Sequence, residues 1–264
     1  MQSLISRLSK FNKQNLVMIQ KTILIYYAVL SDISGETELQ ELDFYLTGFR
    51  RSKTKRYLYR EDRLRSRLSE LLLLVGISDL LGKVTVSLQA NSYGKPFLTD
   101  VEDIHFNISH SGEYVACAFF ETEIGLDVER LETMSDYSIE NIVSFFSEDE
   151  QEYILAEKGL AKSFRLFQVW TIKEAYLKYL GQGLSKSLDS FSLNCEILPG
   201  YFQLAEEIWQ AELEDSFIIQ SKLGKKHLLA LSCDTPADLD FRHIDFSQIS
   251  NVKTRLKASI LDRN

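Results

Sequence analysis

The sequence predicts an α+β protein built from two similar halves that meet near residue 122. The predicted elements run strand, helix, strands, and then strand, helices, strands. Each half also contains a glycine-turned hairpin, ISHSGEYVACAFF in the first and IQSKLGKKHLLALSC in the second. With 264 residues, the chain is long enough for two halves that each bury a core. No linker rich in proline or serine separates them, so we expect tight packing.

Local patterns predict the elements of the first half. We expect a strand at 22–30, a helix over 52–75 that ends near Gly76, a strand at 84–89, a turn around Lys95 and a hairpin at 104–120. In the hairpin, Ile104, Phe106 and Ile108 alternate with polar residues, as in a half-buried strand.

The second half begins with the strand GLDVE at 125–129. Asp136 is a candidate cap for a helix, and Ser147 with Glu150 forms a capping-box pattern before the next helix. A further helix is expected from about 161 to 180, ending at Gly181. Strands are predicted at 189–196, 201–206, 216–222 and 227–233. The predicted organisation is an N-terminal extension at 1–17, subdomains at 18–122 and 123–244, and a polar tail at 245–264.

Composition limits the classes of function. The net charge of −8 argues against a surface that generally attracts nucleic acid or membranes. Cys117, Cys195 and Cys233 are odd in number and widely spaced, so neither a disulfide framework nor a zinc site is indicated. The apolar run 23–30 is too short to cross a bilayer and lacks a signal-peptide cleavage pattern. We therefore expect a cytoplasmic protein.

Carboxylates on the GLDVE strand suggest a metal site. Asp127 and Glu129 are two residues apart, which places both on one face of the strand. Acids held this close repel each other unless a cation is present, and Mg²⁺ uses a few carboxylates together with substrate phosphates. The ordinary alternative is the solvent-facing side of a strand.

The stretch VWTIKEAYLKYLGQGLS carries Glu174, the candidate for a third metal ligand. Glu174 stands four residues before Lys178, which is also the spacing of an ordinary stabilising pair on an exposed helix. Trp170 lies one turn before Glu174, so this face of the helix is expected to be partly covered. For Lys173 the pattern offers no role beyond positive charge.

Basic and polar groups elsewhere are suited to bind the phosphates of a substrate. The segment from 50 to 67 is rich in arginine and lysine, Lys95 lies on a GKP turn, and His110 ends the NIS strand. Each also has an ordinary interpretation, such as a solvated helix face or a loop lysine.

Taken together, GKPF, FNISHSGEYVACAF, GLDVE, FFSEDE and WTIKEAYLKYLGQGLS resemble, in order and spacing, the 4′-phosphopantetheinyl transferases of the large, surfactin-synthetase-activating type. The resemblance covers roughly residues 22–235. It implies a pseudo-twofold monomer of two α+β subdomains, with coenzyme A bound in the cleft between them. Such enzymes transfer the 4′-phosphopantetheine group of coenzyme A to a serine of an apo acyl or peptidyl carrier protein and release adenosine 3′,5′-bisphosphate.

The resemblance also implies roles for individual residues. Asp127, Glu129 and Glu174 match the Mg²⁺-binding acids, Lys178 matches the lysine that contacts the α-phosphate, and Glu174 is our choice of general base. Matches to groups that contact the nucleotide and its phosphates are Lys95, Ser109 and His110, and, more loosely, Arg50, Lys53 and Ser66. Arg65, beside Ser66, is included with this basic set. Arginine replaces the typical lysine at 50, and serine replaces threonine at 66.

Alternative functions predict different behaviour. A metal-dependent nuclease or phosphodiesterase would place Asp127 and Glu129 on the metal and the arginine-rich stretch on a nucleic-acid backbone. Its binding to nucleic acid would be sensitive to salt. A non-enzymatic module with a basic helix would show neither magnesium dependence nor coenzyme A binding. The family resemblance instead predicts a carrier protein and coenzyme A as partners, without nucleic acid or membrane.

Overall fold

The computed structural model describes residues 21–33, 40, 43–82, 87–200, 208–246, 251–254 and 256. The chain forms two compact units: unit 1 comprises Met1–Gln89, Phe97–Glu121 and Ala237–Asn264, and unit 2 comprises Ala90–Pro96 and Thr122–Pro236. Each unit contains helices and a four-stranded sheet, so the predicted mixed α+β class is confirmed. The expected extension at 1–17 and the strand expected at 201–206 lie outside the described residues.

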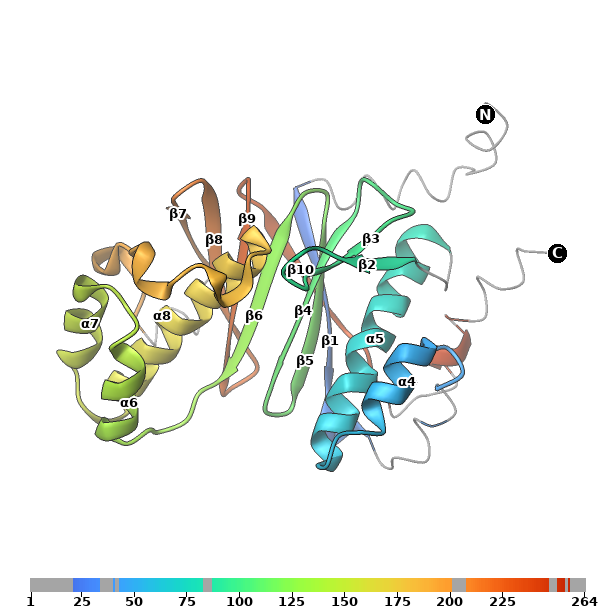
Figure 1. The fold of residues 1–264 in the computed structure, drawn as a ribbon, viewed down its shortest axis with the longest axis horizontal. Helices are drawn as coiled ribbons and strands as arrows, with labels where there is room; N and C mark the ends of the chain where they lie inside the picture. The colour runs from blue at the N-terminus through green and yellow to red at the C-terminus, as the bar shows by residue number, and fades with distance from the viewer. Residues whose placement is uncertain are drawn as a thin grey trace. The chain divides into compact units, whose positions relative to one another are not determined.

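Unit 1 is a sheet covered by one long helix. The sheet has the order β10-β1-β5-β4, formed by Asp238–His243, Thr22–Val29, Tyr114–Phe120 and His105–Ser111. β10 runs parallel to β1, and the other neighbours are antiparallel. Helix α5 (Arg60–Leu81) packs on the sheet, and the short helix α4 (Gly48–Thr54) packs on α5 (Figure 1). The expected hairpin at 104–120 is present as β4–β5.

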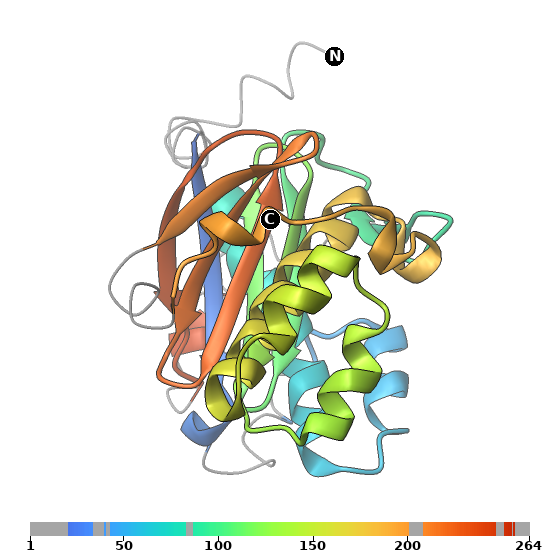
Figure 2. The ribbon, with the colours of Figure 1, turned by 90° about the vertical axis from the view of Figure 1, so that its left-hand side faces the viewer.

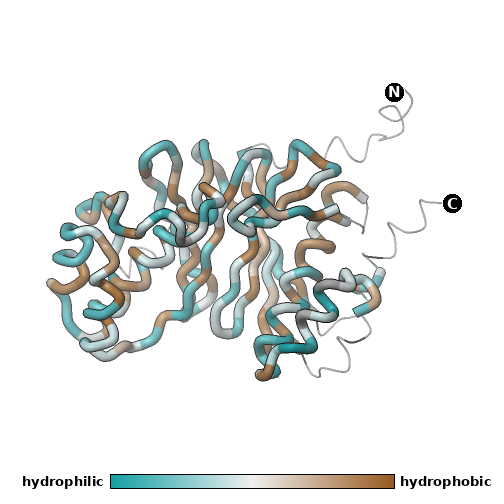
Figure 3. Tube along the Cα trace, viewed as in Figure 1, coloured by the Kyte–Doolittle hydropathy of each residue, from teal (hydrophilic) through white to brown (hydrophobic). Residues whose placement is uncertain are grey.

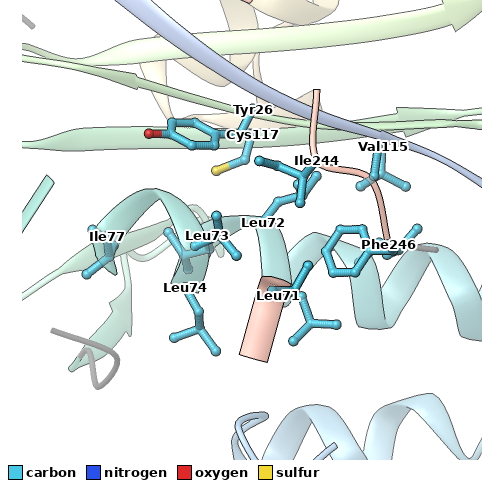
Figure 4. Close-up of a cluster of buried hydrophobic side chains, with 14 of the residues drawn as sticks. Tyr26, Leu71, Leu72, Leu73, Leu74, Ile77, Val115, Cys117, Ile244 and Phe246 are labelled. Carbon is cyan, nitrogen blue, oxygen red and sulfur yellow. The ribbon is translucent and has the colours of Figure 1, made fainter. Parts of the chain in front are cut away.

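The core of unit 1 lies between α5 and the sheet. Figure 4 shows Leu71, Leu72 and Leu73 of α5 among Tyr26, Val115 and Cys117 of the strands, with Ile244 and Phe246 beside them. Val252 and Leu256 are also buried in this core, within the segment that the sequence pattern marks as a polar tail. In Figure 3 the colour of α5 changes from teal near its start to brown in its second half, which supplies most of the core residues of this helix.

The helix predicted over 52–75 is wrong at both ends. The structure has α4 and α5 instead, and α5 runs through Gly76 to end at Gly82, whose φ of 64° closes the helix. Gly76 lies within the helix, and a Cβ there would overlap the ring of Phe119. The glycine therefore permits close packing of α5 on β5 and does not terminate the helix.

Short elements connect the larger ones. The 3₁₀ turn η1 (Leu30–Asp32) follows β1. β2 (Leu88–Ala90) pairs with β3 (Pro96–Leu98), so the strand expected at 84–89 is present at its end, while residues 83–86 lie outside the described part of the chain.

Unit 2 has its own sheet and helices. The sheet order is β6-β9-β8-β7, formed by Ile124–Arg130, His227–Cys233, Ser216–Leu223 and Trp209–Leu213, and all neighbours are antiparallel. Helix α8 (Gly159–Leu180) lies against β6 and β9. Figure 2 shows α6 (Asp136–Val143) and α7 (Glu148–Leu155) on the side of α8 away from the sheet.

Most local predictions in unit 2 are confirmed. The capping box of Ser147 and Glu150 is present, and α8 ends at Gly181 with φ 65°. The cap of α6, however, is Ser135, whose hydroxyl accepts from the Ser138 amide, and not Asp136. The strand predicted at 189–196 is also wrong. This region forms the 3₁₀ turns η3 (Leu188–Ser190) and η4 (Cys195–Ile197), after η2 (Gly183–Ser185).

No helix among the described residues is long and apolar enough to cross a membrane.

Candidate active site

Strand β6 and helix α8 approach each other unusually closely in unit 2. A Cβ at Gly125 would overlap the carbonyl of Ala175 and the amide nitrogen of Tyr179, so only glycine fits at this position. Because side chains alternate along a strand, Gly125, Asp127 and Glu129 share the face that meets α8. The glycine thus lets the helix approach the two acids that follow it.

Asp127, Glu174 and Lys178 come together at this contact. The Lys178 ammonium lies 2.5 Å from Asp127 Oδ1, and Asp127 is only 4% exposed. Burial raises the pKa of the Glu174 carboxyl, the Lys178 charge lowers it, and the Asp127 charge raises it again. The sequence had offered Lys178 as a partner of Glu174 four residues earlier. Its ion pair is instead with an acid on the neighbouring strand.

Glu129 lies further along the same face of β6 and is half-buried. Within the described residues, no group of three or more histidine, cysteine, aspartate and glutamate side chains is arranged to hold a metal ion. The chemistry of the acids nevertheless fits magnesium, which prefers carboxylate oxygens. Asp127 raises the pKa of Glu174, so their charges repel each other, and a cation would relieve this repulsion.

Lys173, next to Glu174 in the sequence, has a different role that the sequence did not reveal. Its side chain is fully buried, and its ammonium lies 2.8 Å from Glu150 Oε2, which is also fully buried. The ammonium also donates to the carbonyls of Leu188 and Phe191 and lies 4.1 Å from the centre of the Phe191 ring. Lys173 therefore binds the segment that follows α8 and does not reach the acids on β6.

Glu150 is the ion-pair partner of Lys173, and the sequence pattern identified it only as part of a helix cap. Its carboxylate accepts from the amides of Ser147 at 3.0 Å and Leu193 at 2.9 Å. Together with Lys173 it explains why 189–196 is not a strand, since backbone groups of this segment bind the buried ion pair instead of a neighbouring strand. The capping-box pattern was the one signal that could have marked Glu150 as structurally important.

Lys95, predicted to contact phosphates, lies in unit 2 at the ends of β6 and α8. Its ammonium is 2.5 Å from Glu123 Oε2, and it donates to the carbonyls of Ile124 at 3.1 Å and Tyr179 at 3.2 Å. Burial lowers the pKa of the Lys95 ammonium, and Glu123 opposes this shift. Lys95 is thus held by its own unit in addition to any role toward a substrate.

In unit 1 the structure brings together two of the predicted residues, Arg50 and Ser66. Arg50 Nη1 lies 3.5 Å from Ser66 Oγ, and Thr54 Oγ1 lies 3.2 Å from the same hydroxyl. Arg50 Nε also forms a 3.0 Å ion pair with Glu70, which is 4% exposed. Glu70 was missed from the sequence, although it stands four residues after Ser66, on the same face of α5.

The other predicted residues of unit 1 are distributed over α4, α5 and β4. Arg65 donates to the Gly112 carbonyl at 2.7 Å and pairs with Asp62 at 2.7 Å, so it binds the turn of the β4–β5 hairpin.

Ser109 and His110 are neighbours on β4. Ser109 is buried and His110 is exposed. As neighbours on β4 they point to opposite faces of the sheet, and His110 shares the α5 side with its partner Val115. Lys53 belongs to α4, and its side chain lies outside the described part of the structure.

Comparison with known proteins matches both units of this architecture. Residues 123–227 match the family described as the 4′-phosphopantetheinyl transferase superfamily, and residues 36–121 match the family described as 4′-phosphopantetheinyl transferase, N-terminal. The 4′-phosphopantetheinyl transferase Sfp of Bacillus subtilis is 34% identical over 171 residues, which cover 64% of this chain and 75% of that protein. The 4′-phosphopantetheinyl transferase gsp of Aneurinibacillus migulanus is 37% identical, covering 52% of this chain and 56% of that protein.

More distant relatives include the 4′-phosphopantetheinyl transferase HetI of Nostoc, 32% identical over 57% of this chain and 66% of that protein. The chain is therefore an enzyme, and its class is transferase. It belongs to the 4′-phosphopantetheinyl transferase superfamily. Family membership decides against the nuclease and the non-enzymatic module that the residue pattern alone had left open.

Proposed function

We propose that this protein transfers the 4′-phosphopantetheine group of coenzyme A to a serine of an apo acyl or peptidyl carrier protein and releases adenosine 3′,5′-bisphosphate. The observation that carries the proposal is the meeting of Asp127, Glu174 and Lys178 where β6 packs on α8. An acid whose pKa is raised can accept a proton, and a lysine beside it can stabilise a phosphate oxygen. Family membership supplies the reaction class in which these groups act.

The reaction assigns a step to each side chain. The hydroxyl oxygen of the carrier serine attacks the β-phosphorus of coenzyme A, while Glu174 takes the hydroxyl proton directly or through water. A P–O bond forms to the serine, and the bond from the β-phosphorus to the bridging oxygen breaks. That oxygen leaves with the α-phosphate as adenosine 3′,5′-bisphosphate. The Lys178 ammonium stabilises the negative charge that develops there.

The proposal includes Mg²⁺, with Asp127, Glu129 and Glu174 as its ligands. Bound magnesium would supply a positive charge that polarises the pyrophosphate. The carboxylates of Asp127, Glu129 and Glu174 would hold this cation, and Glu174 also accepts the proton of the carrier serine. Because Lys178 already pairs with Asp127, we expect the lysine to turn toward the phosphate when substrate binds.

The proposal assigns the nucleotide and its 3′-phosphate to Lys95, Ser109 and His110, and to the set Arg50, Lys53, Arg65 and Ser66. Support within unit 1 comes from the Arg50–Ser66 pair, which presents a guanidinium and a hydroxyl side by side. Glu70 orients that guanidinium through a 3.0 Å ion pair. The similar composition of the two units also supports the proposed pseudo-twofold repeat. Each unit packs a long helix on a four-stranded sheet.

The proposed setting is the cytoplasm, with the enzyme acting as a monomer on a soluble carrier and without nucleic acid or membrane. The free thiols of Cys117, Cys195 and Cys233 support a reducing compartment.

Mass spectrometry of a carrier protein tests the proposal. Candidate apo-carriers are incubated with the protein, coenzyme A and Mg²⁺, and the phosphopantetheine mass is expected on one serine. Asp127→Ala and Glu174→Gln should each abolish the gain while circular dichroism stays that of the wild type. Absence of transfer to every carrier tested, or full transfer by either variant, would contradict the proposed function.

A further inference from the structure

The loop that carries Lys95 contacts the ends of both elements that hold the proposed catalytic groups. β6 carries Asp127 and Glu129, and α8 carries Glu174 and Lys178. The Lys95 ammonium reaches the residues at the start of β6, Glu123 and Ile124, and also the Tyr179 carbonyl in the last turn of α8. One partly buried cation therefore bridges strand and helix.

Asn91 makes a second connection to the same end of α8. Its Nδ2 donates to the carbonyl of Gly181, the residue that caps the helix, at 2.7 Å. Carbonyls in the last turn of a helix have no partner within the helix, so these donors satisfy groups that would otherwise need water. A positive charge at this end also interacts favourably with the helix dipole.

Hydrogen bonds within the loop 91–95 hold the side chains of Asn91 and Lys95 toward α8. Asn91 Oδ1 accepts from the amides of Tyr93 and Lys95, each at 2.9 Å, and the Asn91 amide donates to the Lys95 carbonyl at 3.0 Å. Gly94, with φ 92°, permits the turn. Contact at Gly181 is close, because a Cβ there would lie 2.9 Å from Asn91 Nδ2 and 3.1 Å from Lys95 Cδ.

We propose that Asn91 and Lys95 are positioning residues, which clamp the start of β6 to the C-terminal end of α8 and thereby hold Asp127, Glu174 and Lys178 in register. Lys178 lies one turn before Gly181, where helix ends fray unless they are capped. Loss of the clamp moves Lys178 relative to Asp127 on the strand. For the roles of Glu174 and Lys178 this inference rests on the proposed function.

Asn91→Asp and Asn91→Ala distinguish the hydrogen bond that Asn91 donates to Gly181 from the hydrogen bonds that Asn91 accepts within its own loop. The aspartate keeps an acceptor for the amides of Tyr93 and Lys95 but loses the donor to Gly181, whereas alanine loses both. Ser92→Ala is the matched control, since Ser92 lies in the same loop and is exposed. Lys95→Met removes the cation and keeps most of the stem.

Each full-length variant is assayed for kcat and for KM toward coenzyme A, and its native-state hydrogen exchange is followed in segments 123–127 and 176–183. We expect Asn91→Asp to lower kcat about five- to tenfold, as the loss of one hydrogen bond implies, and Asn91→Ala and Lys95→Met, which lose several contacts, to lower it at least as much. Exchange in both segments should become faster. In the Asn91 variants KM should stay unchanged, and Ser92→Ala should match the wild type.

Several outcomes would overturn the clamp. A wild-type kcat and wild-type exchange in Asn91→Asp would show that the donor to Gly181 is dispensable. In the Asn91 variants, a rise in KM with unchanged kcat would make the loop a substrate contact instead of a clamp. Faster exchange with unchanged kcat would make it a contact that stabilises the fold without positioning the catalytic groups. The exchange measurement needs no carrier, so failure of the clamp is distinguishable from failure of the proposed transfer reaction.

Discussion

Two lysines five residues apart on α8 differ in their surroundings, although each pairs with a carboxylate: Lys173 is fully buried and Lys178 is partly exposed. Lys173 pairs with Glu150 at 2.8 Å, and both side chains are 0% exposed. Lys178 pairs with Asp127 at 2.5 Å, and its side chain is 28% exposed. Lys173 has further partners, because two backbone carbonyls and the Phe191 ring surround its ammonium.

The difference teaches that the spacing of charges along a helix does not reveal their roles. A lysine enclosed by acceptors cannot leave them without exposing buried charge, so Lys173 has a fixed structural role. Lys178 is partly exposed, so its ammonium can turn from Asp127 toward a substrate phosphate while it stays in contact with solvent. Substitutions at both positions, and at a third pair on the same helix, test this interpretation.

The largest effect is expected from Lys173→Met. Glu150 would remain buried without its cation, and breaking a buried pair in this way costs about 3–5 kcal/mol of the free energy of unfolding. Urea denaturation measures the change as a lower midpoint with an unchanged slope.

The double variant Lys173→Met/Glu150→Gln serves as the control. It should be less destabilised than the sum of the single variants, because the glutamine can still accept from the amides of Ser147 or Leu193. A loss below about 1 kcal/mol in Lys173→Met would place this pair among ordinary surface pairs and contradict the comparison.

Lys178→Met should act mainly on catalysis, and it should cost less stability than Lys173→Met, because Lys178 is partly exposed although Asp127 loses its cation. Loss of a group that stabilises developing charge lowers kcat by about 10²–10³-fold. Single-turnover transfer measures the rate, and the urea midpoint should lie above that of Lys173→Met. A large loss of stability with normal kcat would instead give Lys178 the role that we assign to Lys173.

The pKa of Glu174 offers a smaller and signed test. Burial raises the pKa of this carboxyl above the ordinary value of a glutamate. The ionised form, which acts as the base, therefore forms at a higher pH than for an ordinary glutamate. Activity should rise with pH as this carboxyl loses its proton. Because the Lys178 charge lowers the pKa and the Asp127 charge raises it, Lys178→Met should move the titration to higher pH and Asp127→Asn to lower pH. Carbon-detected NMR of the carboxyl group follows both shifts, and shifts in the opposite direction would refute the arrangement.

The smallest effect is expected at the start of α8. Lys162 pairs with Asp136 at 2.9 Å, and the aspartate side chain is 73% exposed. Asp136→Asn should therefore change the free energy of unfolding by less than about 1 kcal/mol, and salt should reduce the difference further. If its effect equalled that of Lys173→Met, burial would not be what separates the pairs.

Short sequence patterns predicted most of the secondary-structure elements. The alternation at 104–108, the capping box of Ser147 and Glu150, and the stop at Gly181 each predicted an element that the structure contains. The acids Asp127 and Glu129 were also placed correctly on one face of a strand. These patterns depend on neighbours within a few residues, so the sequence expresses them directly.

Only the tertiary structure decided which groups meet. Gly76 looked like a helix stop until Phe119, 43 residues away in β5, required the missing side chain. The 189–196 segment looked like a strand, but the carbonyl of Phe191 and that of Leu188 just before the segment accept hydrogen bonds from the buried ammonium of Lys173. Lys95 looked like a loop lysine until the ends of β6 and α8 surrounded it. In each case a partner distant in sequence overrides the local preference, because buried polar groups and close backbone contacts are satisfied only in the assembled fold.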